Sequence, residues 1–470
     1  MATATDFISN VYDMLAKTFS LDSASTDLYL QMAWPGFSIS PTDFKPATMP
    51  QGPYDPDIAE QTFSSIANII PALSKVKFDN SGFEVDDIYE LLLSGAIPVG
   101  TTADTVGTNP LYKLFSDASF EFLNAKKGSK NDPNEFYYPC HATPNNWYDE
   151  AAAASWPTIT IASDDVKPPA PSSTFVRSGG SAALASQGLF KLKPTTVNEA
   201  AIKTNVGKAL TTLSTTIAAK VKPVAAPVAK TVVAKPMAVH MNTAMVATAA
   251  HATAGTAVAK PKDPTAIRTH AFAESFTTAR TQQLFSQKVT PTNVIATDKL
   301  HTVLQTASIN KSTLAINVDK KVPIGNAILL KNLLNQQLDT KHVSTTTNGF
   351  SVSFKVCRVN IDRPWFKLTL LNTKNWYMFG TSQDEYSTGS ADVNPGMFPF
   401  LPVSFIVIHD LKIKANWSQE DKTTVSQSVA FGPFDISNGS FNQDTIEVKG
   451  LQIIGWISRL TPALPPAASV

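Results

Sequence analysis

Two pairs of adjacent residues in this sequence have side chains that could do acid–base or nucleophilic chemistry. The first, His409-Asp410, ends an apolar run that predicts a buried strand, and a histidine beside a carboxylate is a common general acid–base pair. Neighbouring strand residues point to opposite faces of a sheet, which argues against direct contact between these two side chains. The sequence therefore favours a structural role for this pair over catalysis.

The second pair, Cys140-His141, lies in a stretch rich in aromatic residues, prolines and amides. A cysteine becomes a nucleophile only as the thiolate, which needs a nearby base or cation. No further partner is evident in the surrounding sequence. A structural role is again the favoured interpretation.

Familiar local motifs of enzymes are missing from the sequence. It contains no glycine-rich phosphate loop, nucleophile elbow, zinc-protease helix or paired-cysteine metal site. None of the seven histidines lies three or four residues from another, so a local histidine metal site is not expected. We therefore predict no metal, no cofactor and no evident small-molecule substrate. An enzyme of unrecognised type, with a site assembled from distant segments, stays open as an alternative.

The charge of the chain is unevenly distributed, although the formal net charge is only +1. Residues 1–165 contain 22 acidic residues, eight lysines and no arginine, a net charge of −14. Residues 166–470 therefore carry a net charge of +15. Opposite charges on two parts of one chain favour contact between them, within a molecule or between copies.

A basic tract occupies the middle of the chain. Residues 200–262 contain eight lysines but no acidic residue, arginine or aromatic residue. Nucleic-acid-binding tracts combine positive charge with aromatic side chains that stack on bases, and the acidic N-terminal segment would repel a polyanion. The composition argues against nucleic-acid binding and favours a solvated linker.

The start of this middle region predicts a helix with a narrow apolar seam. Thr196 and Glu199 form a capping-box pattern, after which apolar residues recur every three or four positions. A seam on an otherwise polar helix needs a partner to cover it. We interpret it as an interaction surface formed by Ile202, Val206, Leu210, Leu213 and Ile217, followed by the lysines Lys220, Lys222, Lys230 and Lys235.

An uncharged segment, residues 236–259, supports a different hypothesis, in which the protein perturbs membranes. It is bracketed by Lys235 and Lys260, and it would be released onto a membrane surface. His240 and His251 are eleven residues apart, so on a helix they would share a face and could sense acid pH. Dye release from liposomes at neutral and acid pH separates this effector or pore-forming toxin from a purely structural protein.

The N-terminal segment predicts mostly helices with proline-rich joints. Asp55-Pro56 and Asn109-Pro110 are cap-plus-proline starts, and Asp6 is the predicted cap of a first helix. The prolines and glycines between Trp34 and Pro56 predict an irregular loop attached to a core. The aromatic stretch 135–161 predicts a rigid loop that lines a core in preference to a recognition surface.

The C-terminal segment predicts antiparallel strands. Phe350, Val352, Phe354 and Val356 alternate with polar residues after the turn pair 348–349. Similar strand patterns occupy 402–415 and 446–457, and a helix is predicted at 326–338. The predicted fold class is α+β and multidomain, with a mostly helical proline-rich N-terminal domain, a Lys/Ala/Thr-rich helical or linker middle and a β-rich antiparallel C-terminal domain.

The predicted domain boundaries are an acidic helical domain at 1–165, linker and helices at 166–288, a β-rich domain at 289–461 and a disordered tail at 462–470. The N-terminus lacks the basic and apolar regions of a secretory signal, which predicts cytoplasmic synthesis, with specialised export or incorporation into a particle left open. The favoured function is that of a non-enzymatic structural or interaction protein that forms homo-oligomers or docks on a protein partner.

Overall fold

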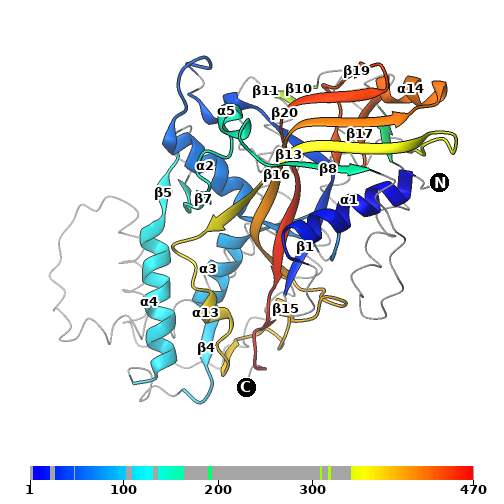
Figure 1. Cartoon of the computed structure of the whole chain (residues 1–470). Coiled ribbons are helices and arrows are strands. Elements are labelled where there is room, and N and C mark those ends of the chain that lie inside the picture. Colours follow the sequence, from blue (N-terminus) through cyan, green and yellow to red (C-terminus); the bar gives the residue numbers. More distant parts are fainter. Residues whose placement is uncertain are drawn as a thin grey trace.

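The fold is a mixed α/β structure built around one large antiparallel sheet (Figure 1). This computed structural model describes residues 4–21, 27–46, 48–72, 74–101, 108–130, 136–162, 189–192, 307–309, 316–318 and 340–468. The predicted seam helix and the helix predicted at 326–338 lie outside these residues.

The large sheet has seven strands in the order β1-β20-β16-β13-β7, with β19 also paired to β20 and β8 also paired to β13. All pairs are antiparallel. The strands are β1 (Leu28–Ile39), β7 (His141–Thr143), β8 (Thr158–Ala162), β13 (Asn348–Asp362), β16 (Phe400–Asn416), β19 (Ser440–Asn442) and β20 (Thr445–Leu460). The prediction of a β-rich, antiparallel C-terminal region is confirmed.

The central strands are buried on both faces of the sheet. Along β16, Phe405 and Val407 belong to one hydrophobic core, whereas Ile406 and Ile408 belong to the other. A strand covered on both faces has apolar residues at consecutive positions instead of alternating ones. This burial explains the continuous apolar run in the sequence just before His409.

Helices cover the sheet from two directions. The first core includes residues of α2 (Pro56–Ala67), α3 (Val85–Gly95), α4 (Pro110–Ala125), α5 (Glu150–Ala153) and α13 (Leu368–Leu371). The second includes residues of α1 (Ala4–Thr18), α14 (Gln419–Ser426) and a small sheet of β12 (Thr340–Lys341), β9 (Phe190–Leu192), β17 (Ser428–Phe431) and β18 (Phe434–Asp435). Figure 1 shows α4 and α13 at the lower left and α14 at the upper right.

Short two-stranded sheets and one 3-10 turn fix the connections. The turn is Pro41–Phe44, and the pairs are β2 (Ile69–Pro71) with β3 (Asn80–Glu84), β4 (Ala96–Pro98) with β14 (Trp376–Met378), β5 (Lys127–Gly128) with β6 (Phe136–Tyr137), β10 (Ala307–Ile309) with β11 (Ile316–Val318), and β15 (Ser387–Thr388) with β21 (Ala463–Leu464). The pair β4–β14 joins segments that are hundreds of residues apart, and the pair β15–β21 fastens the C-terminal residues to the rest of the structure.

Local capping signals correctly predicted where two helices begin. The Asp55 side chain accepts hydrogen bonds from the amides of Asp57 and Ile58 at the start of α2, and Asn109 accepts one from Leu111 at the start of α4. The third prediction was wrong in detail, because α1 begins at Ala4, before the predicted cap Asp6.

Two predicted irregular segments are ordered by tertiary contacts. Residues 34–39, predicted as loop, belong to β1, because the strand pairs with β20 and buries Phe37 and Ile39. The predicted disordered tail contains β21, in which Leu464 is fully buried and its carbonyl accepts a hydrogen bond from the Tyr386 amide. The sequence alone did not reveal the partners that order these segments.

The N-terminal and C-terminal segments share one sheet. Strands β1, β7 and β8 come from the segment predicted as a separate helical domain, yet they pair with β20 and β13. The N-terminal segment does contain four of the longer helices, but its strands complete the C-terminal sheet. Strand pairing therefore joins the two segments across the predicted boundary at residue 165.

The aromatic stretch 135–161 mostly lines the core, as predicted. Tyr138 and Trp147 are buried, and Trp147 packs edge-on against Phe405 with ring centroids 5.0 Å apart. Phe136 differs, because 60% of its surface is exposed. The stretch thus joins the helical layer to the sheet and leaves one ring on the surface.

Candidate functional site

His409 and Asp410 make direct contact, contrary to the expectation from strand alternation. His409 Nδ1 lies 3.1 Å from Asp410 Oδ2. The register between β16 and β20 shifts between His409 and Leu411, and Asp410 has a positive φ of 54°. A β-bulge inserts an extra residue and redirects its side chain, which removes the alternation on which the expectation rested.

Lys355 completes this small polar cluster. It pairs with His409 in the β13–β16 register, its Nζ lies 3.5 Å from Asp410 Oδ2, and the same Nζ donates a 2.9 Å hydrogen bond to the Ala154 carbonyl. The His409 Nδ1 atom is buried, and its approach to Asp410 lacks the alignment of a hydrogen bond. The arrangement connects the end of α5 to two strands and fits a structural role.

We expect the substitution His409→Gln to lower the free energy of unfolding by no more than about 1–3 kcal/mol, as for loss of one buried polar interaction. Urea denaturation of the purified variant measures this change. Lys412→Gln, at an exposed position of the same strand, is the control and should leave stability nearly unchanged. A normally folded His409→Gln protein that lost its biological activity would contradict the structural assignment.

In the other candidate pair, Cys140 and His141, one side chain is buried in the core and the other lies at the surface. Cys140 is 1% exposed, and burial raises the pKa of its thiol to about 12. Its Sγ donates to Asn68 Oδ1 at 3.4 Å, and its amide donates to Ser64 Oγ at 2.8 Å. The thiol is therefore a protonated core group anchored to α2 and the residue that follows it.

His141 instead joins a surface network centred on Glu60. Its Nε2 lies 3.5 Å from Glu60 Oε2, and its Nδ1 lies 3.8 Å from Asp362 Oδ2. Glu60 Oε1 also accepts hydrogen bonds from Lys127 Nζ at 2.6 Å and from the Tyr137 hydroxyl at 2.9 Å. Burial and the contact with Glu60 raise the pKa of Tyr137. These contacts hold β5, β6 and β7 against α2.

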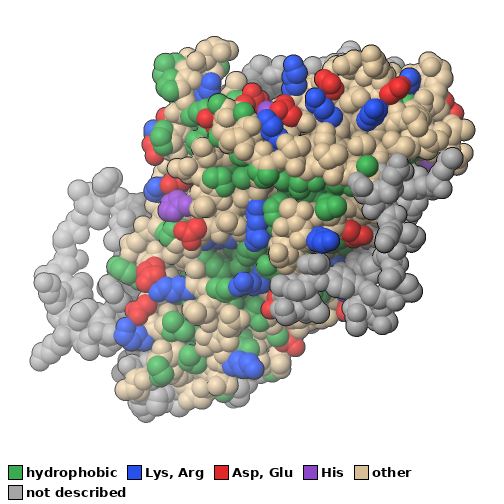
Figure 2. Space-filling view, in the orientation of Figure 1, with side chains coloured by type: hydrophobic (Ala, Val, Ile, Leu, Met, Phe, Trp, Pro, Cys, Tyr) green, Lys and Arg blue, Asp and Glu red, His purple; other side chains and the backbone are tan. Residues whose placement is uncertain are grey.

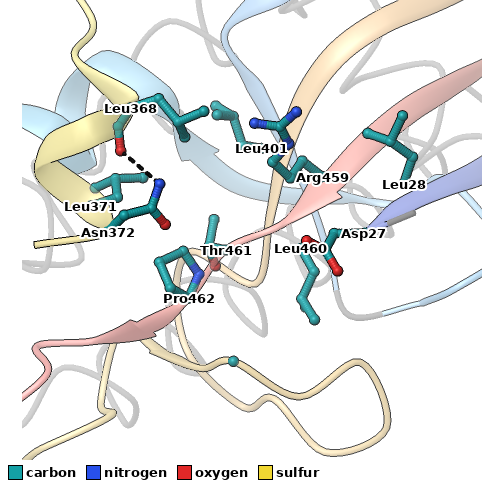
Figure 3. Close-up of a pocket in the computed structure, with 11 residues that line it drawn as sticks. Asp27, Leu28, Leu368, Leu371, Asn372, Leu401, Arg459, Leu460, Thr461 and Pro462 are labelled. Atoms are coloured by element: carbon teal, nitrogen blue, oxygen red, sulfur yellow. Dashed lines mark hydrogen bonds between the residues drawn. The ribbon is translucent and has the colours of Figure 1, made fainter. Parts of the chain in front are cut away.

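A pocket with a volume of about 460 Å³ lies where β20 ends (Figure 3). The start of β1, the helix α13, the start of β16 and the loop around Gly389 form its other sides. Its lining residues are Asp27, Leu28, Leu368, Leu371, Asn372, Gly389, Leu401, Arg459, Leu460, Thr461 and Pro462.

Arg459 is the one cationic side chain among the described residues that line this pocket. It is paired in register with Leu28 on β1 and with Leu401 on β16, so three neighbouring strands place these side chains in one row. Arg459 could not be identified from the sequence, because an arginine at the end of an apolar strand has no distinctive local pattern. Its setting depends on two strands that are distant in sequence.

The residues proposed earlier as an interaction surface and as pH sensors lie outside the part of the chain that the structure describes. These are Ile202, Val206, Leu210, Leu213, Ile217, Lys220, Lys222, Lys230, Lys235, His240 and His251. Their roles stay predictions.

The described residues contain neither a metal-ligand cluster nor a membrane-spanning helix. No three or more His, Cys, Asp or Glu side chains in the described ranges converge on a common metal position. None of the described helices is both long and apolar enough to cross a membrane. No family model, curated protein or solved structure matches the chain at a significant level.

Proposed function

We propose that this protein is a non-enzymatic interaction protein that self-associates, with the outer edge of β8 as a contact between copies. The observation that carries the proposal is the setting of β8 at the border of the large sheet. One edge of β8 pairs with β13, and no strand within the described residues pairs with the other. An unpaired strand edge is a template for another strand.

The backbone register identifies which groups point outward. The Val356 amide donates to the Pro157 carbonyl at 3.0 Å, and β8 continues with Thr158 opposite Lys355 and Ile159 opposite Phe354. Hydrogen-bonded and non-bonded pairs alternate along an antiparallel ladder. The backbone groups of Thr158 and Thr160 therefore face away from β13.

The side chains near β8 also suit a protein contact. The strand has the sequence TITIA, without a charged residue or a proline to discourage pairing. Figure 2 shows hydrophobic side chains gathered in a band between β8 and α1. Residues such as Ile161 anchor the strand in the core, so the edge is held rigidly. A rigid edge loses little conformational entropy when a second strand binds.

Charge provides a second contribution to self-association. Residues 1–165 carry −14 and the remainder of the chain +15, so one copy can attract another of the same kind. Attraction between exposed charges is screened over roughly 8 Å at physiological salt. We expect raising the salt concentration from about 20 mM to about 500 mM to reduce the assembly mass measured by light scattering.

The edge itself is tested by the substitution Thr160→Lys. Because Thr160 is exposed and its backbone faces outward, a lysine there should weaken association at least about tenfold while leaving the fold intact. Analytical ultracentrifugation over a range of protein concentrations measures the dissociation constant.

Ser440→Lys provides a matched control, because it places the same charge on β19, an exposed strand elsewhere in the sheet. Its association should match that of the unaltered protein. The proposed contact through β8 is wrong if the unaltered protein is monomeric at every concentration. It is also wrong if both variants have the same dissociation constant as the unaltered protein.

A further inference from the structure

We propose that the pocket at the end of β20 binds a small monocarboxylate with an apolar body. The Arg459 guanidinium would pair with the carboxylate, and the partly exposed leucines Leu368 of α13 and Leu28 of β1 would contact the apolar part. This inference concerns a site that is separate from the β8 edge and does not depend on self-association.

The three arginines in the described part of the chain differ in the hydrogen bonds that their guanidinium groups make. Arg363 donates to Asn68 Oδ1 at 3.2 Å and to the Pro402 carbonyl at 2.8 Å, and Arg358 donates to Ser404 Oγ at 3.0 Å. Arg459 is partly buried, yet no hydrogen bond or ion pair with a described residue engages its side chain. Its five donors are thus available to an external acceptor.

The surroundings of Arg459 favour an apolar ligand over a bare inorganic ion. Leu28, Leu368 and Leu460 line the pocket and are partly exposed, so they offer apolar surface to a ligand, whereas Leu401 and Leu371, 4% and 2% exposed, are fixed parts of the core behind them. Figure 3 shows the Leu368, Leu401, Arg459 and Leu28 side chains arranged along one side of the pocket. A guanidinium and a carboxylate form short, often bidentate hydrogen bonds that are roughly twice as strong as those between neutral groups.

The other polar groups limit the ligand to one carboxylate. Figure 3 shows Asp27 on the opposite side of β20 from the Arg459 guanidinium, where its carboxylate would repel a second anionic group. The Thr461 hydroxyl already contacts Ser387 Oγ at 2.8 Å, and the Asn372 amide donates to the Leu368 carbonyl at 3.3 Å. Arg459 is therefore the principal donor offered to a ligand.

The size of the pocket suits a short aliphatic acid. Its volume of about 460 Å³ falls within the usual range for small-molecule sites, roughly 300–1,000 Å³. A straight chain of about eight carbons would extend from Arg459 towards Leu368. Octanoate is accordingly a suitable probe, and 1-octanol and octylammonium have the same apolar chain with a neutral or a cationic head.

Isothermal titration of the full-length protein with these three probes tests the proposal. We expect octanoate to bind with about 1:1 stoichiometry and at least about tenfold more tightly than 1-octanol, since a charge-assisted hydrogen bond contributes about 1.5–3 kcal/mol. Octylammonium should bind more weakly still. The substitution Arg459→Gln should weaken octanoate binding at least about tenfold and leave 1-octanol binding unchanged.

Lys374→Gln is the matched control, because it removes one positive charge from an exposed position near α13 that does not line the pocket. Octanoate affinity should change less than about twofold, since exposed charges are screened. Arg459→Lys, which keeps the charge, should retain part of the affinity and guards against a misfolded Gln variant. Absence of saturable octanoate binding, equal binding of octanoate and 1-octanol, or equal effects of Arg459→Gln and Lys374→Gln would each overturn the proposal.

Discussion

Cys140 in the native protein should react with iodoacetamide at pH 8 about a thousandfold more slowly than an unperturbed cysteine, because the thiolate is the reactive form. Burial raises the pKa of Cys140 to about 12 from an ordinary value of 9.0. Each pKa unit lowers the thiolate fraction about tenfold when the pH lies below both values. Restricted access of the reagent to a thiol that is 1% exposed lowers the rate further.

Mass spectrometry of labelled peptides measures both cysteines in one sample. Cys357 is half-buried and its pKa is raised to about 11 by burial, so it should label about tenfold faster than Cys140. In about 6 M guanidinium chloride both residues should label at similar rates, which provides the unfolded reference. Rapid labelling of Cys140 under native conditions would show that the thiol is activated and would restore the nucleophile hypothesis.

The same pKa shift predicts a loss of stability in alkali. The folded-state pKa of Cys140 lies above the unfolded value, so the unfolded chain loses this proton first as the pH rises. Between about pH 9 and pH 12 the contribution of Cys140 to the free energy of unfolding should fall by about 1.4 kcal/mol per pH unit. Below pH 9 this contribution should be constant. Urea denaturation of the unaltered protein and of Cys140→Ala, under reducing conditions at several pH values, measures this effect. The difference between the two proteins gives the pH dependence due to Cys140, because the ionisation of the tyrosines affects both alike.

The substitution Arg363→Met should lower the free energy of unfolding by about 3–5 kcal/mol, because it removes three buried hydrogen bonds from a charged donor, each of which contributes about 1.5–3 kcal/mol, while it also removes a charge that is costly to bury. Arg363 is 8% exposed and donates to Asn68 Oδ1 at 3.2 Å, to the Pro402 carbonyl at 2.8 Å and to the Ala67 carbonyl. Methionine has a similar apolar stem but removes the hydrogen bonds to both carbonyls and leaves Asn68 Oδ1 with only the weak thiol donor of Cys140. Because the bonds join the end of α2 to β16, the loss should loosen the helical layer from the sheet.

Arg358→Met is the matched control for this experiment. Arg358 is about half-buried and donates one hydrogen bond, to Ser404 Oγ, so its replacement should cost only about 1 kcal/mol. Thermal and urea denaturation of both variants give the comparison. Equal losses of stability would mean that Arg363 contributes through its aliphatic stem and not through its three acceptors.

The sequence by itself determined the features whose causes are local. Asp55 and Asn109 cap the helices that follow them, because a capping side chain bonds to amides only two or three residues away. The alternation from Phe350 to Val356 likewise predicted a strand with one buried face, and β13 confirms it. Such signals depend on backbone geometry over a few residues, and they are readable without knowing the neighbours in space.

Only the tertiary structure decided which distant segments meet. The pairing of β1 with β20 turns a proline- and glycine-rich stretch into a strand, since more than 400 residues separate the partners Leu28 and Arg459. The bulge at Asp410 brings this carboxylate to His409, and the pairing of β21 with β15 orders the C-terminal residues. The setting of Arg459 between Leu28 and Leu401 has the same origin, because strand register is fixed by the packing of both sheet faces and not by the local sequence.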